Sequence, residues 1–221
     1  MLRSHKKLTK KEMKQDSLII ITAKTVEYIR NEWVKIGSII LGVIVIVSVS
    51  LFTVRGLERS EINAYDIAIN AFINNEPEAT ELLTKYINSH GGSKRAAGIL
   101  INLGNQYYAR RDYDSAESYF KKYIKKFSKD PLYGFNAYNA LGGIYEEKEN
   151  YIEAGKIYEE FISKYDKSFF VPKMYLNAGN AYYLGGDKDS AIRNYNKIVN
   201  SYGDSKEKQE AIFYLEMLQD D

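Results

Sequence analysis

Residues 103–120 read LGNQYYARRDYDSAESYF, residues 141–158 read LGGIYEEKENYIEAGKIY, and residues 178–195 read AGNAYYLGGDKDSAIRNY. All three stretches have glycine at the second position, tyrosine three residues later, a polar segment, an alanine, and an aromatic residue four positions after the alanine. This spacing fits two helices joined by a short turn, because apolar residues then recur along one face of each helix. The pattern predicts a helical hairpin that is repeated along the chain.

The pattern continues on both sides of these stretches at a period of about 37 residues. An earlier unit carries Ala68 and Leu83 at matching positions, but it lacks the tyrosine and has a shorter turn over 75–77. Leu215 stands at the matching position of a further first helix, which no second helix follows in the pattern. A lone first helix of this kind is typical of a terminal cap. We therefore expect repeats at about 61–96, 97–134, 135–171 and 172–205, and a capping helix over 206–220.

This signature resembles that of the tetratricopeptide repeat (TPR) family, and the resemblance covers residues 61–221. It implies an all-α solenoid of about four helix-turn-helix repeats, in which the first helices line a concave groove that binds proteins or peptides. In each unit the small residue lets two helices approach closely, and the aromatic residues fill the space between stacked hairpins. The polar turns after each second helix are similar to those of bacterial cell-envelope repeat proteins.

Residues 36–54 form a run of nineteen positions without a charge, which is long enough for one membrane-spanning helix. A buried core helix is an alternative, but it would normally have a polar face. A cleaved signal peptide is another, but its apolar region is usually shorter and ends at a small-x-small site. We predict an uncleaved transmembrane helix.

The charges on either side of this run predict its orientation. Residues 1–35 contain nine Lys or Arg and four acidic residues, so the net charge of +2 for the whole chain leaves −3 for the rest. The positive-inside rule then places the N-terminus in the cytoplasm and the repeats in the periplasm or another extracytoplasmic space. This balance gives no support to nucleic-acid binding. We predict a basic cytoplasmic tail over 1–16, an amphipathic juxtamembrane helix over 17–35, the transmembrane helix over 36–54, a linker over 55–60 and the TPR domain over 61–221.

The residues that catalysis or metal binding would require are scarce. The chain has no cysteine and only two histidines, His5 in the tail and His90 at an aromatic position of the repeat. An ordinary zinc site needs more ligands than these. The acidic residues over 146–149 lie in one hairpin without a partner base, which is typical of a solvated helix end. We predict no enzyme activity, no metal and no cofactor.

The first helices contain polar and aromatic positions that are candidates for a peptide groove. Asparagine can both donate to and accept from a peptide backbone, and tyrosine offers a large surface with a polar tip. The alternative is structural, since an asparagine beside glycine can bond to the neighbouring hairpin. The carboxylate clamp of the family is not preserved, because Ile101 stands where it requires lysine and Asn177 where it requires arginine. The candidate groove residues, which we expect to be exposed, are Ile101, Asn105, Tyr108, Asn139, Glu146, Lys173, Leu176, Asn180 and Tyr183.

A basic tail, one span and exterior repeats together resemble the ancillary subunit family of the bacterial Sec translocon. The resemblance implies a scaffold at the bacterial inner membrane whose partners are the translocon, exported chains or periplasmic chaperones. A structural or self-associating organiser of a cell-envelope or division complex is the alternative, and homo-oligomers would then form. An adaptor in a mitochondrial membrane and an adaptor that regulates an enzyme also remain open.

Overall fold

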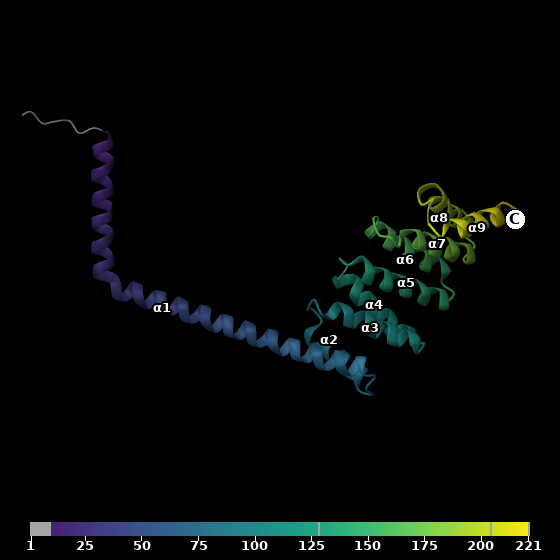
Figure 1. Ribbon diagram of the computed structural model, residues 1–221, viewed down its shortest axis with the longest axis horizontal. Coiled ribbons are helices and arrows are strands. Elements are labelled where there is room, and N and C mark those ends of the chain that lie inside the picture. The colour runs from purple at the N-terminus through teal and green to yellow at the C-terminus, as the bar shows by residue number, and fades with distance from the viewer. Residues whose placement is uncertain (1–9, 128, 204, 221) are drawn as a thin grey trace, which may run out of the picture. The chain divides into compact units, whose positions relative to one another are not determined.

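The computed structural model describes residues 10–127, 129–203 and 205–220, and within these ranges the chain consists of α-helices joined by turns (Figure 1). The first nine residues of the basic tail predicted over 1–16 lie outside the described residues. The chain divides into two compact units between Ser60 and Glu61.

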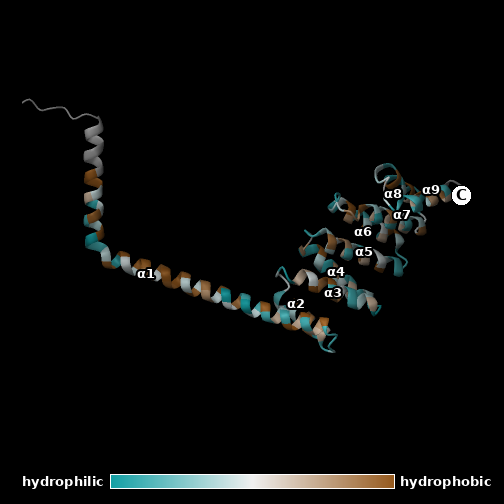
Figure 2. Ribbon diagram, viewed as in Figure 1, coloured by the Kyte–Doolittle hydropathy of each residue, from teal (hydrophilic) through white to brown (hydrophobic). Residues whose placement is uncertain are grey.

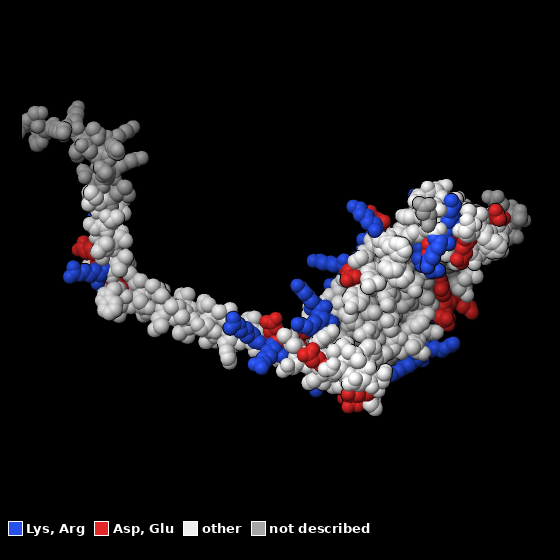
Figure 3. All heavy atoms as spheres, in the orientation of Figure 1, with Lys and Arg blue, Asp and Glu red and all other residues white. Residues whose placement is uncertain are grey.

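The N-terminal unit consists of the first part of helix α1, Lys10–Ile73. Residues 17–54 are helical throughout, and residues 55–60, which we expected to form a linker, belong to the same helix. Within the described residues, α1 is the one helix that is long and apolar enough to cross a membrane, and the apolar stretch within it is fully exposed. Figure 2 shows this stretch as brown interrupted by paler residues, and in Figure 3 it is white, without the blue and red of charged side chains. A signal sequence has the same composition.

The second unit contains the end of α1 and eight further helices, which stack as successive antiparallel pairs. This arrangement confirms the predicted all-α, TPR-like solenoid. The first pair is formed by the last turns of α1 and by α2, and the capping helix is α9. The helices after α1 are α2 Ala79–His90, α3 Ala96–Ala109, α4 Tyr113–Phe127, α5 Pro131–Glu147, α6 Tyr151–Lys164, α7 Val171–Leu184, α8 Lys188–Ser201 and α9 Lys208–Asp220.

Glycines on the first helices explain why the paired helices lie so close. A Cβ atom on Gly104 would lie 2.5 Å from the ring of Phe120, and one on Gly142 would lie 2.3 Å from the ring of Tyr158. In the next repeat, Gly179 faces Tyr195 in the same way at 2.4 Å. Any larger residue would push the aromatic ring out of the core, which is why the glycine and the aromatic residue recur together.

The turns within the hairpins share a backbone conformation that ends each first helix. Arg111, Glu149 and Gly186 have φ values of 60°, 56° and 78°, in the left-handed region. The following amide N–H donates back into the helix in each case, for example from Asn150 to the carbonyl of Tyr145 at 2.8 Å. This is the usual way to stop a helix and satisfy its last carbonyl groups.

The hairpins pack on one another through a core dominated by aromatic rings. Phe120, Tyr138, Tyr158 and Tyr195 are buried, and they bridge successive hairpins together with leucine and isoleucine side chains. Because each hairpin is packed on the next through these rings, the first helices α3, α5 and α7 are held side by side with one face uncovered. Figure 1 shows these helices in consecutive layers of the solenoid.

Candidate binding groove

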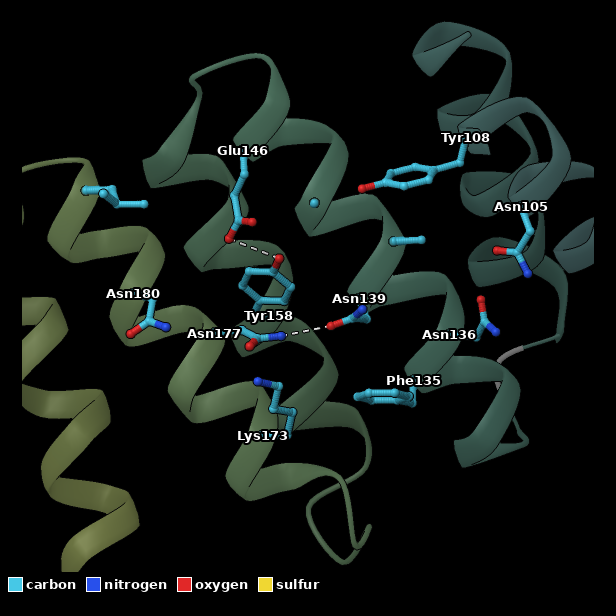
Figure 4. A pocket seen from close by; sticks show the side chains of 13 residues that line it. Asn105, Tyr108, Phe135, Asn136, Asn139, Glu146, Tyr158, Lys173, Asn177 and Asn180 are labelled. Carbon is cyan, nitrogen blue, oxygen red and sulfur yellow. Dashed lines mark hydrogen bonds between the residues drawn. The ribbon is translucent and has the colours of Figure 1, made fainter. Parts of the chain in front are cut away.

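A cavity of about 660 Å³ lies along the uncovered face of α3, α5 and α7. Six of the nine candidate residues line it: Asn105, Tyr108, Asn139, Glu146, Lys173 and Asn180. Figure 4 shows these side chains, which come from three successive repeats. Whether they bind a peptide is not settled by their position and stays a prediction.

The other three candidates lie elsewhere. Ile101 is 3 % exposed and Leu176 is 1 % exposed, because both pack into the aromatic and aliphatic core. The expectation that these two side chains are exposed groove positions was therefore wrong. Tyr183 is half-buried and packs against Tyr214 of α9, with ring centroids 6.0 Å apart, and it does not line the cavity.

Helical periodicity explains which residues face the cavity. On α7, Lys173, Asn177, Asn180 and Leu184 follow one another at intervals of three or four residues and so share one face. The sequence reasoning missed seven of the lining residues, although several of them lie one turn from a candidate and could have been found by extending the helical face. These are Phe135, Asn136, Ala140, Gly143, Tyr158, Asn177 and Leu184.

Five asparagines line the cavity, and they differ in how they are bonded. The Nδ2 of Asn177 donates to the Oδ1 of Asn139 at 2.8 Å, which links α7 to α5. The Oδ1 of Asn180 accepts a hydrogen bond from the hydroxyl of Tyr195 at 2.8 Å. In the described ranges, Asn105 and Asn136 are exposed and their side chains have no hydrogen-bond partner. The cavity therefore presents carboxamide donors and acceptors that remain available to a ligand.

The two ends of the cavity carry opposite charges. Figure 4 shows Glu146 and Tyr108 toward one end, and Lys173 and Phe135 toward the other. Burial raises the pKa of Glu146, and Glu147 adds to this, whereas the hydroxyl of Tyr158, which donates to Glu146 at 3.1 Å, and Lys173 lower the pKa. Burial also raises the pKa of Tyr108, with a further contribution from Glu147 and Glu146. An elongated ligand would therefore be oriented by its own charges.

Gly143 keeps the middle of the cavity open. It stands at the repeat position that Asn105 and Asn180 occupy in the neighbouring repeats, and a Cβ atom there would lie 3.1 Å from the hydroxyl of Tyr108. The absence of a side chain leaves space between Tyr108 and α5. An asparagine at this position would reach into the cavity and narrow it.

No group of three or more His, Cys, Asp or Glu residues that could hold a metal ion occurs among the described residues. His90 packs against the buried ring of Tyr86, with ring centroids 5.3 Å apart. This contact is the one that its aromatic position in the repeat suggested.

Comparisons with known proteins show that the chain contains tetratricopeptide repeats. A family model described as tetratricopeptide repeat matches residues 100–130 and 174–205, and a second model with the same description matches residues 135–163. The three matched segments correspond to the three repeats with the full sequence signature. A comparison with curated proteins finds no match.

Among solved structures, MamA of strain AMB-1 is similar, with 16 % identity and a TM-score of 0.51, over 66 % of this chain and 75 % of that one. PilF of Pseudomonas aeruginosa is similar at 17 % identity with a TM-score of 0.46, over 62 % of this chain and 59 % of that one. The likeness to MamA is one of fold.

Proposed function

We propose that this chain is a membrane-anchored scaffold whose repeats bind an extended protein segment in the groove of α3, α5 and α7. One observation carries the proposal: five asparagines from three successive first helices line one cavity, and the carboxamide groups of two of them, Asn105 and Asn136, bond to no other described residue. TPR domains are a family of protein-interaction scaffolds, which supports the same conclusion.

The geometry suits a peptide in an extended conformation. Such a backbone presents one N–H and one C=O group per residue, and each must be paired when water is displaced. Asparagine side chains can pair with both groups. The volume of the cavity lies within the size range of ligand sites, and the lack of a side chain on Gly143 leaves its centre open. We expect the positive residues of the ligand near Glu146 and its acidic residues near Lys173.

The proposal places the scaffold at the bacterial inner membrane, with residues 36–54 as the span. The exposed apolar surface of α1 in this range supports a span, because such a surface is unfavourable in water. The excess of Lys and Arg over 1–35 supports a cytoplasmic N-terminus and periplasmic repeats. The ligands would be exported chains, translocon subunits or periplasmic chaperones, as the resemblance to the ancillary translocon subunit implies.

A specific observation favours a second function. The bond from Asn177 to Asn139 joins two repeats, and the bond from Tyr195 to Asn180 joins the two helices of one repeat, so part of the asparagine surface serves to hold the helices together. If the groove asparagines serve only to bond the helices to one another, the groove receives no client segment. The chain would then organise an envelope complex or associate with itself.

The test is crosslinking of the full-length protein in its native membrane, followed by identification of partners by mass spectrometry. The groove variant is Asn105→Ala with Asn136→Ala, because both residues are exposed and bond to no other described residue. The matched control is Asn196→Ala with Asn200→Ala, two exposed asparagines of α8 that do not line the cavity.

We expect the groove variant to capture at least about fivefold fewer chains than wild type, because it should lose more than about one kcal/mol of binding energy. The control variant should capture as many chains as wild type. A partner set that is identical in wild type, groove variant and control would refute groove binding. That result would identify the chain as an organiser.

A further inference from the structure

A second cavity, of about 970 Å³, lies beside the groove where the α6–α7 turn meets the α8–α9 turn. We call it the end pocket. Its apolar wall consists of Phe135, Phe169, Phe170, Pro172 and Tyr202. The TPR signature does not predict it, because it is formed by the turns between repeats and not by the faces of the first helices.

Phe169 is the most unusual residue of the end pocket. Its side chain is 88 % exposed, although its neighbour Phe170 is half-buried and stacks on Phe135 with ring centroids 4.1 Å apart. The ring of Phe170 therefore holds the turn in place, whereas the ring of Phe169 adds apolar surface that the fold itself does not cover. Exposed apolar surface next to a cavity is typical of binding sites.

Among the described residues that line the end pocket, the charges are mainly positive. Lys167, Lys173 and Lys206 line it, and in the described part of the chain none of them forms a salt bridge. The carboxylate that lines it belongs to Glu207, which is only 7 % exposed. The N-terminal ends of α7 and α9 are also located here, and helix N-termini favour negative charge.

Ser205 adds a polar group to this surface. Its Oγ atom is buried and has no hydrogen-bond partner among the described residues, and Ser205 lines the end pocket. A hydroxyl group in this state can donate to a carboxylate or a carbonyl oxygen of a ligand. Apolar walls, three ammonium groups and a hydroxyl donor together suit a large apolar side chain that has an acidic residue beside it.

The end pocket and the groove are contiguous. Phe135 and Lys173 line both cavities, and Figure 4 shows the two side chains together near one end of the groove. A segment that lies along the groove toward Lys173 would therefore reach the end pocket next. Lys173 is shared, so an acidic residue of the segment would be held at the point where the two cavities meet.

We infer that the end pocket anchors a large apolar side chain, adjacent to an acidic residue, of the same extended segment that occupies the groove. This inference rests on the proposed function and adds the sequence class of the ligand: an acidic segment with an aromatic or long aliphatic anchor. A membrane surface could also meet an exposed phenylalanine among lysines, but a concave pocket fits a protruding side chain better than it fits a flat bilayer.

The experiment selects peptides from a phage-displayed library of random twelve-residue sequences on the full-length protein in detergent micelles. Four forms are compared: wild type, Phe169→Ser, the groove variant Asn105→Ala with Asn136→Ala, and Leu132→Ser. Leu132 is the matched control, because it is 61 % exposed at the corresponding position one repeat earlier and does not line the end pocket. Fluorescence anisotropy then measures the affinity of the most enriched peptide, labelled with fluorescein, for each form.

We expect wild type and Leu132→Ser to enrich peptides in which a large apolar residue neighbours Asp or Glu. Phe169→Ser should lose this preference and bind the peptide about tenfold more weakly, because the anchor is then less well buried. Replacing the apolar residue of the peptide by serine should weaken its binding to wild type to a similar extent and should have little further effect on Phe169→Ser.

The results can separate a failure of the end-pocket inference from a failure of the groove proposal. Peptides that bind wild type without this pattern, or that bind Phe169→Ser equally well, would overturn the inference and leave the groove proposal standing. No enrichment by wild type would overturn both. Binding of short-chain phosphatidylglycerol to the micelle-bound protein tests the membrane alternative: loss of lipid binding by Phe169→Ser, with peptide affinity unchanged, would also overturn the inference.

Discussion

The repeats at 97–134 and 172–205 have the same apolar contact but different polar ones. In both, a glycine of the first helix packs against an aromatic ring of the second, Gly104 against Phe120 and Gly179 against Tyr195. Tyr195 carries a hydroxyl group, which donates to Asn180, whereas Phe120 has none, and Asn105 therefore stays exposed. Two asparagines at equivalent positions thus have different roles.

The repeat between them gives a third solution. It has Gly143 in place of the asparagine, and the hydroxyl of Tyr158 donates instead to Glu146, one turn further along α5. The repeat pattern therefore determines the packing of the hairpins. The presence or absence of one hydroxyl group in each repeat determines which groove residues are available to a ligand.

The largest effect is expected from breaking the shared contact. Gly142→Ala places a methyl group 2.3 Å from the ring of Tyr158, and overpacking of this kind should lower the free energy of unfolding by about 2 kcal/mol. Thermal unfolding followed by circular dichroism measures the change. Gly143→Ala is the control, because its methyl group would meet only the hydroxyl of Tyr108 at 3.1 Å and it adds helix propensity. Equal melting temperatures for the two variants would show that the close contact is not required.

A smaller effect is expected from exchanging the hydroxyl groups. Tyr195→Phe removes the bond to Asn180 from a buried site and should cost about 1 kcal/mol of stability. The reverse change, Phe120→Tyr, offers a hydroxyl group to Asn105 and should alter stability by less than about 1 kcal/mol while weakening peptide binding in the groove. Urea unfolding and the anisotropy assay measure the two effects. Peptide affinity that is unchanged in Phe120→Tyr would show that Asn105 does not contact the ligand.

The smallest effect concerns the pH dependence of the middle repeat. Because burial raises the pKa of Glu146, the folded state binds its proton more tightly than the unfolded state, whose value is near 4.5. The ionised carboxylate therefore lowers stability above the raised pKa, and this penalty disappears as the pH falls below about 4. Glu146→Gln should be more stable than wild type at pH 7 by less than about 1 kcal/mol, and the difference should approach zero at acid pH. The free energies of unfolding of wild type and Glu146→Gln are measured across this pH range. A stability difference between them that grows toward low pH would contradict the prediction.

Much of the fold could be predicted from the sequence because its determinants are local and repeated. The recurrence of Gly104, Gly142 and Gly179 with their aromatic partners indicated both the hairpins and their period, and the structure contains the close contacts that this recurrence implies. The candidate site was predicted less completely. Asn105, Tyr108 and Glu146 line the cavity, but Ile101 and Leu176 were assigned to the wrong face, since helical spacing alone does not say where the stack of hairpins covers a helix.

The sequence by itself therefore determined the helical hairpins, their period and the apolar stretch of α1, since each depends on a pattern of residues that are near one another along the chain. Only the tertiary structure decided which asparagines are bonded within the fold, and that Phe135 and Lys173 join the groove to the end pocket. These features depend on contacts between different helices, either within one hairpin, as for Tyr195 and Asn180, or between neighbouring repeats, as for Asn139 and Asn177, and helix packing sets the positions of such residues.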